Sequence, residues 1–167
     1  MHSIWIADDD EAIRLVLEES LSSSGYKTKS FASGEDLFKE LEKDKPDLVI
    51  TDIQMPGMLG YDLLKHINNN FDDLPVIVMT AFSDMQAAVE SFGGGAFEYL
   101  PKPFDLEEAT NIIERAFEEK PKTKSLRTES KVDIIGESKS MQDVFRSIGK
   151  LSSTIATVLI QGEAGTG

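Results

Sequence analysis

Short apolar runs alternate with amphipathic segments along residues 3–118, and this alternation constrains the fold more than any other feature of the 167-residue chain. Strands are predicted at residues 4–7, 26–30, 47–51, 76–79 and 96–100. A segment with helical spacing or a helix-capping signal follows each strand. The first helix is expected to bury Ile13, Val16, Leu17 and Leu21, and the second to begin after Ser33. The third is expected to cover 61–70, and the fourth to run from Ser83 to the glycines at 93–95. The last helix, after Asp105, is expected to bury Leu106, Ala109, Ile112, Ile113, Ala116 and Phe117.

Five strand–helix units in this order predict an α/β fold with a doubly wound parallel sheet. Each pair of parallel neighbouring strands needs a right-handed crossover, which the intervening helix supplies. The expected strand order is the flavodoxin-like 2-1-3-4-5, in which ligands bind at the carboxyl ends of the first and third strands.

Polar residues stand at the predicted carboxyl ends of the strands. Asp8, Asp9 and Asp10 follow the first strand, Asp52 follows the third, and Thr80 ends the fourth, while Pro101-Lys102-Pro103 follow the fifth. Because these ends share one edge of a parallel sheet, carboxylates, a hydroxyl and an ammonium group are expected to converge there. Asp10 directly precedes a helical segment and is therefore expected to cap that helix rather than to bind a metal.

The charge distribution argues against nucleic-acid binding by the first 120 residues. The chain has a net charge of −13, and residues 121–167 hold seven basic and five acidic side chains, which leaves ten basic and 25 acidic ones in residues 1–120. An acidic surface of this kind repels phosphate backbones. The chain has no cysteine, which excludes disulfides and thiolate metal sites, and no apolar run approaches the ~20 residues of a membrane span. The expected compartment is the cytoplasm.

Residues 1–118 resemble the receiver domain of bacterial response regulators. The matching positions are Asp8-Asp9, Asp52-Ile53-Gln54-Met55-Pro56 with Gly57, Thr80-Ala81, Tyr99 and Lys102-Pro103. The resemblance implies a phosphoacceptor domain that receives a phosphoryl group on Asp52 from a sensor histidine kinase. It also implies a Mg²⁺ ion bound by Asp9, Asp52 and the main-chain carbonyl of Gln54, with Asp8 acting through water.

The same resemblance gives roles to residues of the fourth and fifth strands. Lys102 is expected to offset charge on the transferring phosphoryl group, and Thr80 to bind a phosphoryl oxygen. Tyr99 is expected to turn inward in response, and a cis peptide bond is expected before Pro103. The expected output face is the surface made by the helix that ends at the glycines 93–95, the fifth strand and the last helix. The glycines would let that helix end shift, although they could equally just end the helix.

The last part of the chain suggests a second, incomplete domain. Residues 119–133 are polar and read as a linker. Residues 134–167 resemble the start of the AAA+ ATPase domain of sigma-54-dependent activators, and the whole chain resembles their NtrC family of nitrogen regulators. Gly162, Gly165 and Gly167 form the frame of a phosphate-binding loop that stops before its lysine.

This pattern predicts a regulatory protein rather than an enzyme. The expected partners are its own ATPase region and further copies of the chain, while DNA and sigma-54 RNA polymerase would be reached only through parts absent from this sequence. Two positions depart from the family pattern. Leu59 stands where the family often has Asp, and Gly94-Gly95 replaces a helix-compatible residue before the glycine.

Two other functional classes stay open. A scaffold could use the same fold for binding without phosphorylation. A haloacid-dehalogenase-like phosphatase also uses an aspartate on a doubly wound sheet, with a D-x-D pattern that Asp8 and Asp10 match in spacing. Thr or Val is expected after that pattern, however, and Glu11 and Ala12 stand there instead.

Overall fold

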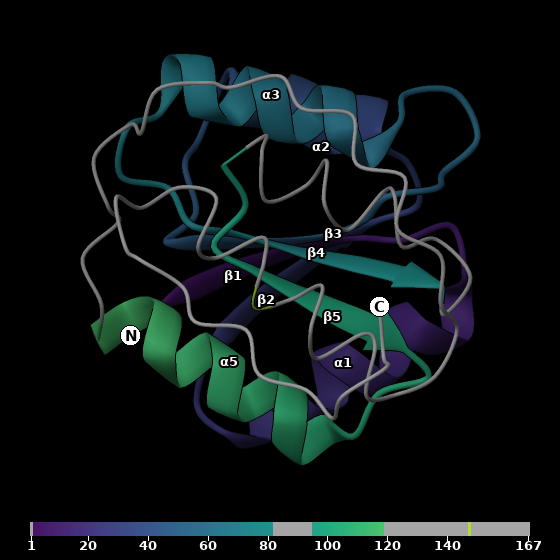
Figure 1. Cartoon of the computed structure of the whole chain (residues 1–167), viewed down its shortest axis with the longest axis vertical. Helices are drawn as coiled ribbons and strands as arrows, with labels where there is room; N and C mark the ends of the chain where they lie inside the picture. Colours follow the sequence, from purple (N-terminus) through teal and green to yellow (C-terminus); the bar gives the residue numbers. More distant parts are fainter. Residues whose placement is uncertain (1, 82–94, 119–146, 148–167) are drawn as a thin grey trace, which may run out of the picture.

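Five parallel strands form one sheet in the order β2-β1-β3-β4-β5 (Figure 1). The computed structural model describes residues 2–81, 95–118 and 147. The strands are β1 (Ser3–Ala7), β2 (Lys27–Phe31), β3 (Leu48–Asp52), β4 (Val76–Ala81) and β5 (Glu98–Lys102), and the described helices are α1 (Glu11–Ser23), α2 (Gly34–Leu41), α3 (Gly60–Asn70) and α5 (Leu106–Glu118). The predicted doubly wound, flavodoxin-like order is confirmed.

Several predictions concern residues outside the described ranges. They are the helix from Ser83, the linker at 119–133, and, apart from residue 147, the segment 134–167 with Gly162, Gly165 and Gly167. Within the described ranges, no helix is both long and apolar enough to cross a bilayer.

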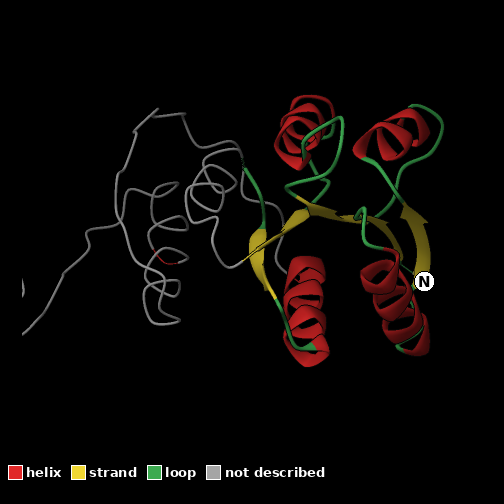
Figure 2. Ribbon diagram, turned by 90° about the vertical axis from the view of Figure 1, so that its right-hand side faces the viewer, coloured by secondary structure: helices red, strands yellow, loops and turns green. Residues whose placement is uncertain are grey.

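The sheet separates two layers of helices, with α1 and α5 on one face and α2 and α3 on the other (Figure 2). Successive strand residues point to opposite faces. Ile4 and Ile6 of β1 therefore pack with α1 and α5, whereas Trp5 and Ala7 pack with α2 and α3. Because both faces are covered, the central strands are apolar along most of their length, as expected for a buried parallel sheet, and their polar residues lie at or near the strand ends.

The predicted boundaries were wrong for all five strands. β1 begins at Ser3 rather than at Ile4, β2 spans Lys27–Phe31 rather than 26–30, and β3 ends at Asp52 rather than at Thr51. β3 begins at Leu48 rather than at Asp47, whose carboxylate accepts a hydrogen bond of 2.7 Å from the Ser3 N–H. β4 continues to Ala81, and β5 spans Glu98–Lys102 rather than 96–100. Pro101 lies inside β5, which is the end strand of the sheet among the described residues; an end strand tolerates proline because part of its N–H groups face no neighbouring strand.

The capping predictions for α1 and α2 are confirmed. Asp10 Oδ1 accepts a hydrogen bond of 2.8 Å from the Ala12 N–H at the start of α1. Ser33 Oγ accepts one of 3.2 Å from the Asp36 N–H at the start of α2. Both side chains satisfy helix N–H groups that have no partner within the helix.

Two residues that were expected to be buried are exposed. Val16 is 49% exposed and Leu106 is 37% exposed. They line an apolar groove of about 460 Å³, together with Ala12, Ile13, Lys102, Pro103 and Phe104. Helical spacing indicates which residues share a face, but it does not indicate how much of that face the sheet covers.

Candidate functional site

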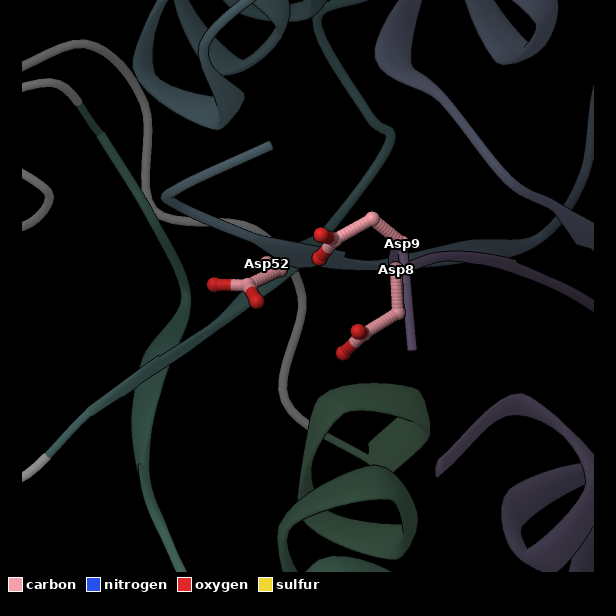
Figure 3. A group of neighbouring side chains, drawn as sticks. All are labelled: Asp8, Asp9 and Asp52. Atoms are coloured by element: carbon pink, nitrogen blue, oxygen red, sulfur yellow. The ribbon is translucent and has the colours of Figure 1, made fainter. Parts of the chain in front are cut away.

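Three carboxylates meet at the carboxyl ends of β1 and β3 (Figure 3). Ala7 pairs with Thr51 in the parallel register, so Asp8 and Asp52 follow at the same level of the sheet. One carboxylate oxygen each from Asp8, Asp9 and Asp52 lie within 4.8 Å of one another. Asp8 and Asp52 are buried, whereas Asp9 is exposed.

Lys102 links the two buried carboxylates. Its Nζ lies 2.6 Å from Asp8 Oδ2 and 2.5 Å from Asp52 Oδ2, and its side chain is only 17% exposed. Side chains along a strand alternate between the two faces of the sheet, so Asp8, Asp52 and Lys102 are directed to the α1–α5 face. The residues two positions before them in the same strands, Ile6, Ile50 and Leu100, pack on that face. The extension of β5 to Lys102 therefore brings the ammonium group into the site.

The electrostatics of the site favour a bound cation. Burial raises the pKa of the Asp8 carboxyl above its usual range, although hydrogen bonds from Lys102 and the Asp10 N–H act in the opposite direction and lower it. Burial lowers the pKa of Lys102, but its hydrogen bonds to Asp52 and Asp8 outweigh this effect and leave the pKa raised. Three carboxylates thus face one ammonium group.

The donor set also fits a hard divalent cation such as Mg²⁺, which prefers carboxylate, carbonyl and water oxygens. Asp8, Asp9 and Asp52 supply carboxylate oxygens close enough together to share one ion. A divalent ion would relieve the part of the repulsion among the three carboxylates that the single ammonium group does not offset.

Main-chain N–H groups fix the two buried carboxylates. Asp52 Oδ1 accepts a hydrogen bond of 3.1 Å from the Gln54 N–H, and Asp8 Oδ1 accepts one of 2.9 Å from the Asp10 N–H. Asp10 therefore serves the site through its main chain, while its side chain caps α1. The two oxygens of Asp52 have different partners, with Oδ1 bound to the loop and Oδ2 bound to Lys102.

Arg14 of α1 is a residue that the sequence reasoning missed. Its Nη1 donates hydrogen bonds of 2.7 Å to the Asp8 carbonyl and 3.1 Å to the Asp9 carbonyl. The guanidinium group holds the turn that carries both carboxylates. Because the acceptors are main-chain atoms, no side-chain pattern indicates this contact.

Thr80 and Tyr99 lie in β4 and β5 beside the site. Asp52 pairs with Met79, so Thr80 lies one residue beyond it in β4. Thr80 is fully buried, and its hydroxyl approaches the Ala81 carbonyl at 3.5 Å. Tyr99 is 2% exposed. The expected cis peptide bond between Lys102 and Pro103 is present.

The family described as response regulator receiver domain matches residues 4–114. The chain belongs to this family. As a receiver domain, it is a regulatory module of a two-component system, and the family membership predicted from the sequence is confirmed. The match begins in β1 and ends in α5, so it spans every described strand and helix.

Relatives and solved structures agree with this assignment. The chain is 46% identical to the DNA-binding transcriptional regulator NtrC of Escherichia coli strain K12, over 98% of this chain and 36% of the relative. A receiver domain protein of Clostridium thermocellum has a TM-score of 0.67 and 28% identity, over 71% of this chain and 95% of that one. The beryllofluoride-activated NtrC4 receiver domain dimer has a TM-score of 0.67 and 30% identity, over 71% of this chain and 98% of that one. The chain thus spans little more than a third of the length of the NtrC relatives that it matches.

Proposed function

We propose that this receiver domain accepts a phosphoryl group on Asp52 from a sensor histidine kinase in a Mg²⁺-dependent reaction. The position of Lys102 carries the proposal, since its ammonium group lies within hydrogen-bond distance of both Asp52 and Asp8. A buried carboxylate held between a cation and a main-chain N–H is oriented for attack, and the same cation can offset charge on the incoming phosphoryl oxygens.

Asp9, Asp52 and the Gln54 carbonyl are the proposed direct ligands of Mg²⁺, with Asp8 acting through water. When bound, the ion would neutralise carboxylate charge and the charge that develops on the phosphoryl oxygens. Support comes from the 4.8 Å grouping of the three carboxylates. Arg14 would keep the first two of them in place through its bonds to their main-chain carbonyls.

The proposed transfer moves one phosphoryl group between two side chains. An Asp52 carboxylate oxygen forms a bond to phosphorus while the N–P bond of the kinase phosphohistidine breaks. The histidine leaves as neutral imidazole, because its other ring nitrogen keeps a proton. Thr80 would then bind an oxygen of the aspartyl phosphate, and Tyr99 would follow by repacking. Positioning and electrostatics supply most of the acceleration in such reactions.

The kinase is proposed to dock on the apolar groove between α1 and the β5–α5 connection. This groove shares Lys102 with the site, so a protein seated on Val16 and Leu106 would lie beside Asp52. Val16→Asp should slow transfer from the kinase by about tenfold, which corresponds to about 1.4 kcal/mol, but leave labelling by acetyl phosphate unchanged. Leu15→Asp, on the same helix and 57% exposed, is the matched control.

The wider role of the protein is also a proposal. The NtrC relatives are described as DNA-binding transcriptional regulators, and this chain covers 36% of their length. We infer a cytoplasmic activator in which residues 1–118 form the receiver, 119–133 a linker and 134–167 the start of an ATPase domain. Phosphorylation of the receiver would control assembly of that ATPase region, whose phosphate loop includes Gly162, Gly165 and Gly167.

Beryllofluoride with Mg²⁺ tests the proposal, because it mimics an aspartyl phosphate without being consumed. The amide NMR signals of the β3–α3 loop and of β4 should shift in the wild-type protein and stay unchanged in Asp52→Asn. A scaffold that works without phosphorylation would show no shift in either protein. A phosphatase of the D-x-D type would need the Asp10 carboxylate, which caps α1 in this structure.

A further inference from the structure

The loop that follows Asp52 is held by a side chain from another helix. Glu35, in the first turn of α2, accepts a hydrogen bond of 2.6 Å from the Met58 N–H through its Oε1. Glu35 is half-buried at this contact. A carboxylate that accepts from a main-chain N–H in a partly buried position makes one of the stronger hydrogen bonds in proteins.

The packing around this contact is close. Gly57 has a φ of +85°, and a Cβ atom at this position would lie 2.2 Å from Glu35 Oε1. A Cβ atom at Gly34 would lie 3.1 Å from the Met58 carbonyl oxygen. The glycines on both sides therefore let the loop lie directly against the first turn of α2, with the Glu35 carboxylate between them.

The two ends of the same loop are fixed at the phosphoacceptor. The Gln54 N–H donates to Asp52 Oδ1 at 3.1 Å, and the Gly60 N–H donates to the Ile53 carbonyl at 3.0 Å. These bonds hold the loop at the end of β3 and at the start of α3. The bond to Glu35 differs from them because it ties the far side of the loop to α2.

We propose that Glu35 is a positioning residue for the metal and phosphoryl site. Its carboxylate holds the 54–59 loop, and with it the main-chain carbonyl of Gln54, in the conformation that Mg²⁺ binding requires. The inference rests on the proposed phosphoacceptor function, in which Gln54 supplies a ligand oxygen. Mutation of a residue that orients a metal ligand without binding the metal itself commonly weakens metal binding by about tenfold or more.

The test compares three variants of the full chain. Glu35→Ala removes the acceptor, whereas Glu35→Gln keeps an amide oxygen of similar shape. Glu107→Ala is the control, because it removes an exposed carboxylate from the first turn of α5 and so reproduces only the loss of a favourable charge at a helix N-terminus. Two quantities are measured: hydrogen exchange of the Met58 amide without metal, and the Kd for Mg²⁺ alone by NMR titration.

Glu35→Ala should speed exchange of the Met58 amide and weaken Mg²⁺ binding by about tenfold, while Glu35→Gln stays within about threefold of the wild type. An unchanged Kd in a folded Glu35→Ala protein would overturn the inference, as would an equal loss in Glu107→Ala. If Glu35→Ala does not fold, Glu35→Asp gives the answer, because its shorter side chain draws the carboxylate away from the Met58 N–H but keeps the charge in the first turn of α2, and it should weaken Mg²⁺ binding as well. A wild-type chain that binds no Mg²⁺ would instead contradict the proposed function, even if the Met58 amide behaves as expected.

Discussion

The ammonium nitrogen of Lys102 lies 2.5 Å from the Asp52 carboxylate, although fifty residues separate them in the sequence. The contact exists because β5 runs two residues further than its apolar run and ends at Lys102. It places one positive charge among three carboxylates. The stability of the metal-free domain should therefore depend on the charges of Lys102 and of these carboxylates.

Lys102→Ala should destabilise the metal-free protein by about 1–3 kcal/mol, because it leaves Asp8 and Asp52 close together without their common partner. Urea unfolding in the presence of a chelator measures the loss. Mg²⁺ should then stabilise the variant more than it stabilises the wild type. Lys65→Ala, which removes an exposed lysine from α3, should change neither quantity.

Asp8→Asn should stabilise the metal-free protein in a pH-dependent way. Burial raises the pKa of Asp8 in the folded state, so the native protein holds its proton at a pH where the unfolded chain has lost it. The cost of ionised Asp8 is therefore absent below about pH 4, the ordinary range of an aspartate, and grows as the pH rises through the raised pKa. Urea midpoints of the two proteins should coincide in acid and diverge towards neutral pH. Midpoints that differ by a constant amount would contradict this explanation.

Leu59→Asp should stabilise the domain by about 1 kcal/mol. Leu59 occupies the N-cap position of α3, makes no side-chain capping bond and is 49% exposed. An aspartate there could accept a hydrogen bond from the first turn and face the positive end of the helix dipole. Thermal unfolding measures the gain. Leu59→Ala serves as the control, since it removes the exposed side chain without adding a cap; an equal gain in both variants would rule out capping as the cause.

Gly60→Ala should destabilise the domain by about 2–4 kcal/mol and disturb Asp52, the proposed phosphoacceptor. A Cβ atom at Gly60 would lie 1.9 Å from the main-chain carbonyl oxygen of Asp52, so α3 cannot start there without moving β3. Gly25→Ala is the comparison, because Gly25 has a φ of +86° but open space around it and should cost only about 1 kcal/mol. Chemical denaturation gives both values, and similar losses would mean that close approach to Asp52 is unimportant.

The sequence was sufficient to predict the layers and the strand order. Apolar runs such as Ile4–Ala7 alternate with helical segments, and only a few topologies satisfy that alternation. It also placed Asp8, Asp9, Asp52 and Lys102 at strand ends that share one edge. It failed at Val16 and Leu106, because periodicity cannot indicate where the sheet stops covering a helix.

Arg14 and Glu35 were beyond the reach of sequence reasoning for a different reason. Each side chain contacts main-chain atoms of a loop near the site, and every residue type carries such atoms. Gly57 is a partial signal in the sequence, since a glycine can adopt a backbone conformation that other residues rarely adopt, and the structure shows such a conformation here with a φ of +85°. The sequence does not indicate that Glu35 is the neighbour of this glycine, because the contact depends on how α2 packs against the loop.

The identity of the modified residue tests the central claim most directly. The wild-type chain and Asp52→Asn are incubated with Mg²⁺ and acetyl phosphate, and the labelled peptides are mapped by mass spectrometry. We predict one phosphoryl group on the wild-type chain, sensitive to hydroxylamine and located on Asp52, and none on the variant. Equal labelling of Asp52→Asn, or a phosphoryl group on another residue of the wild type, would contradict the account.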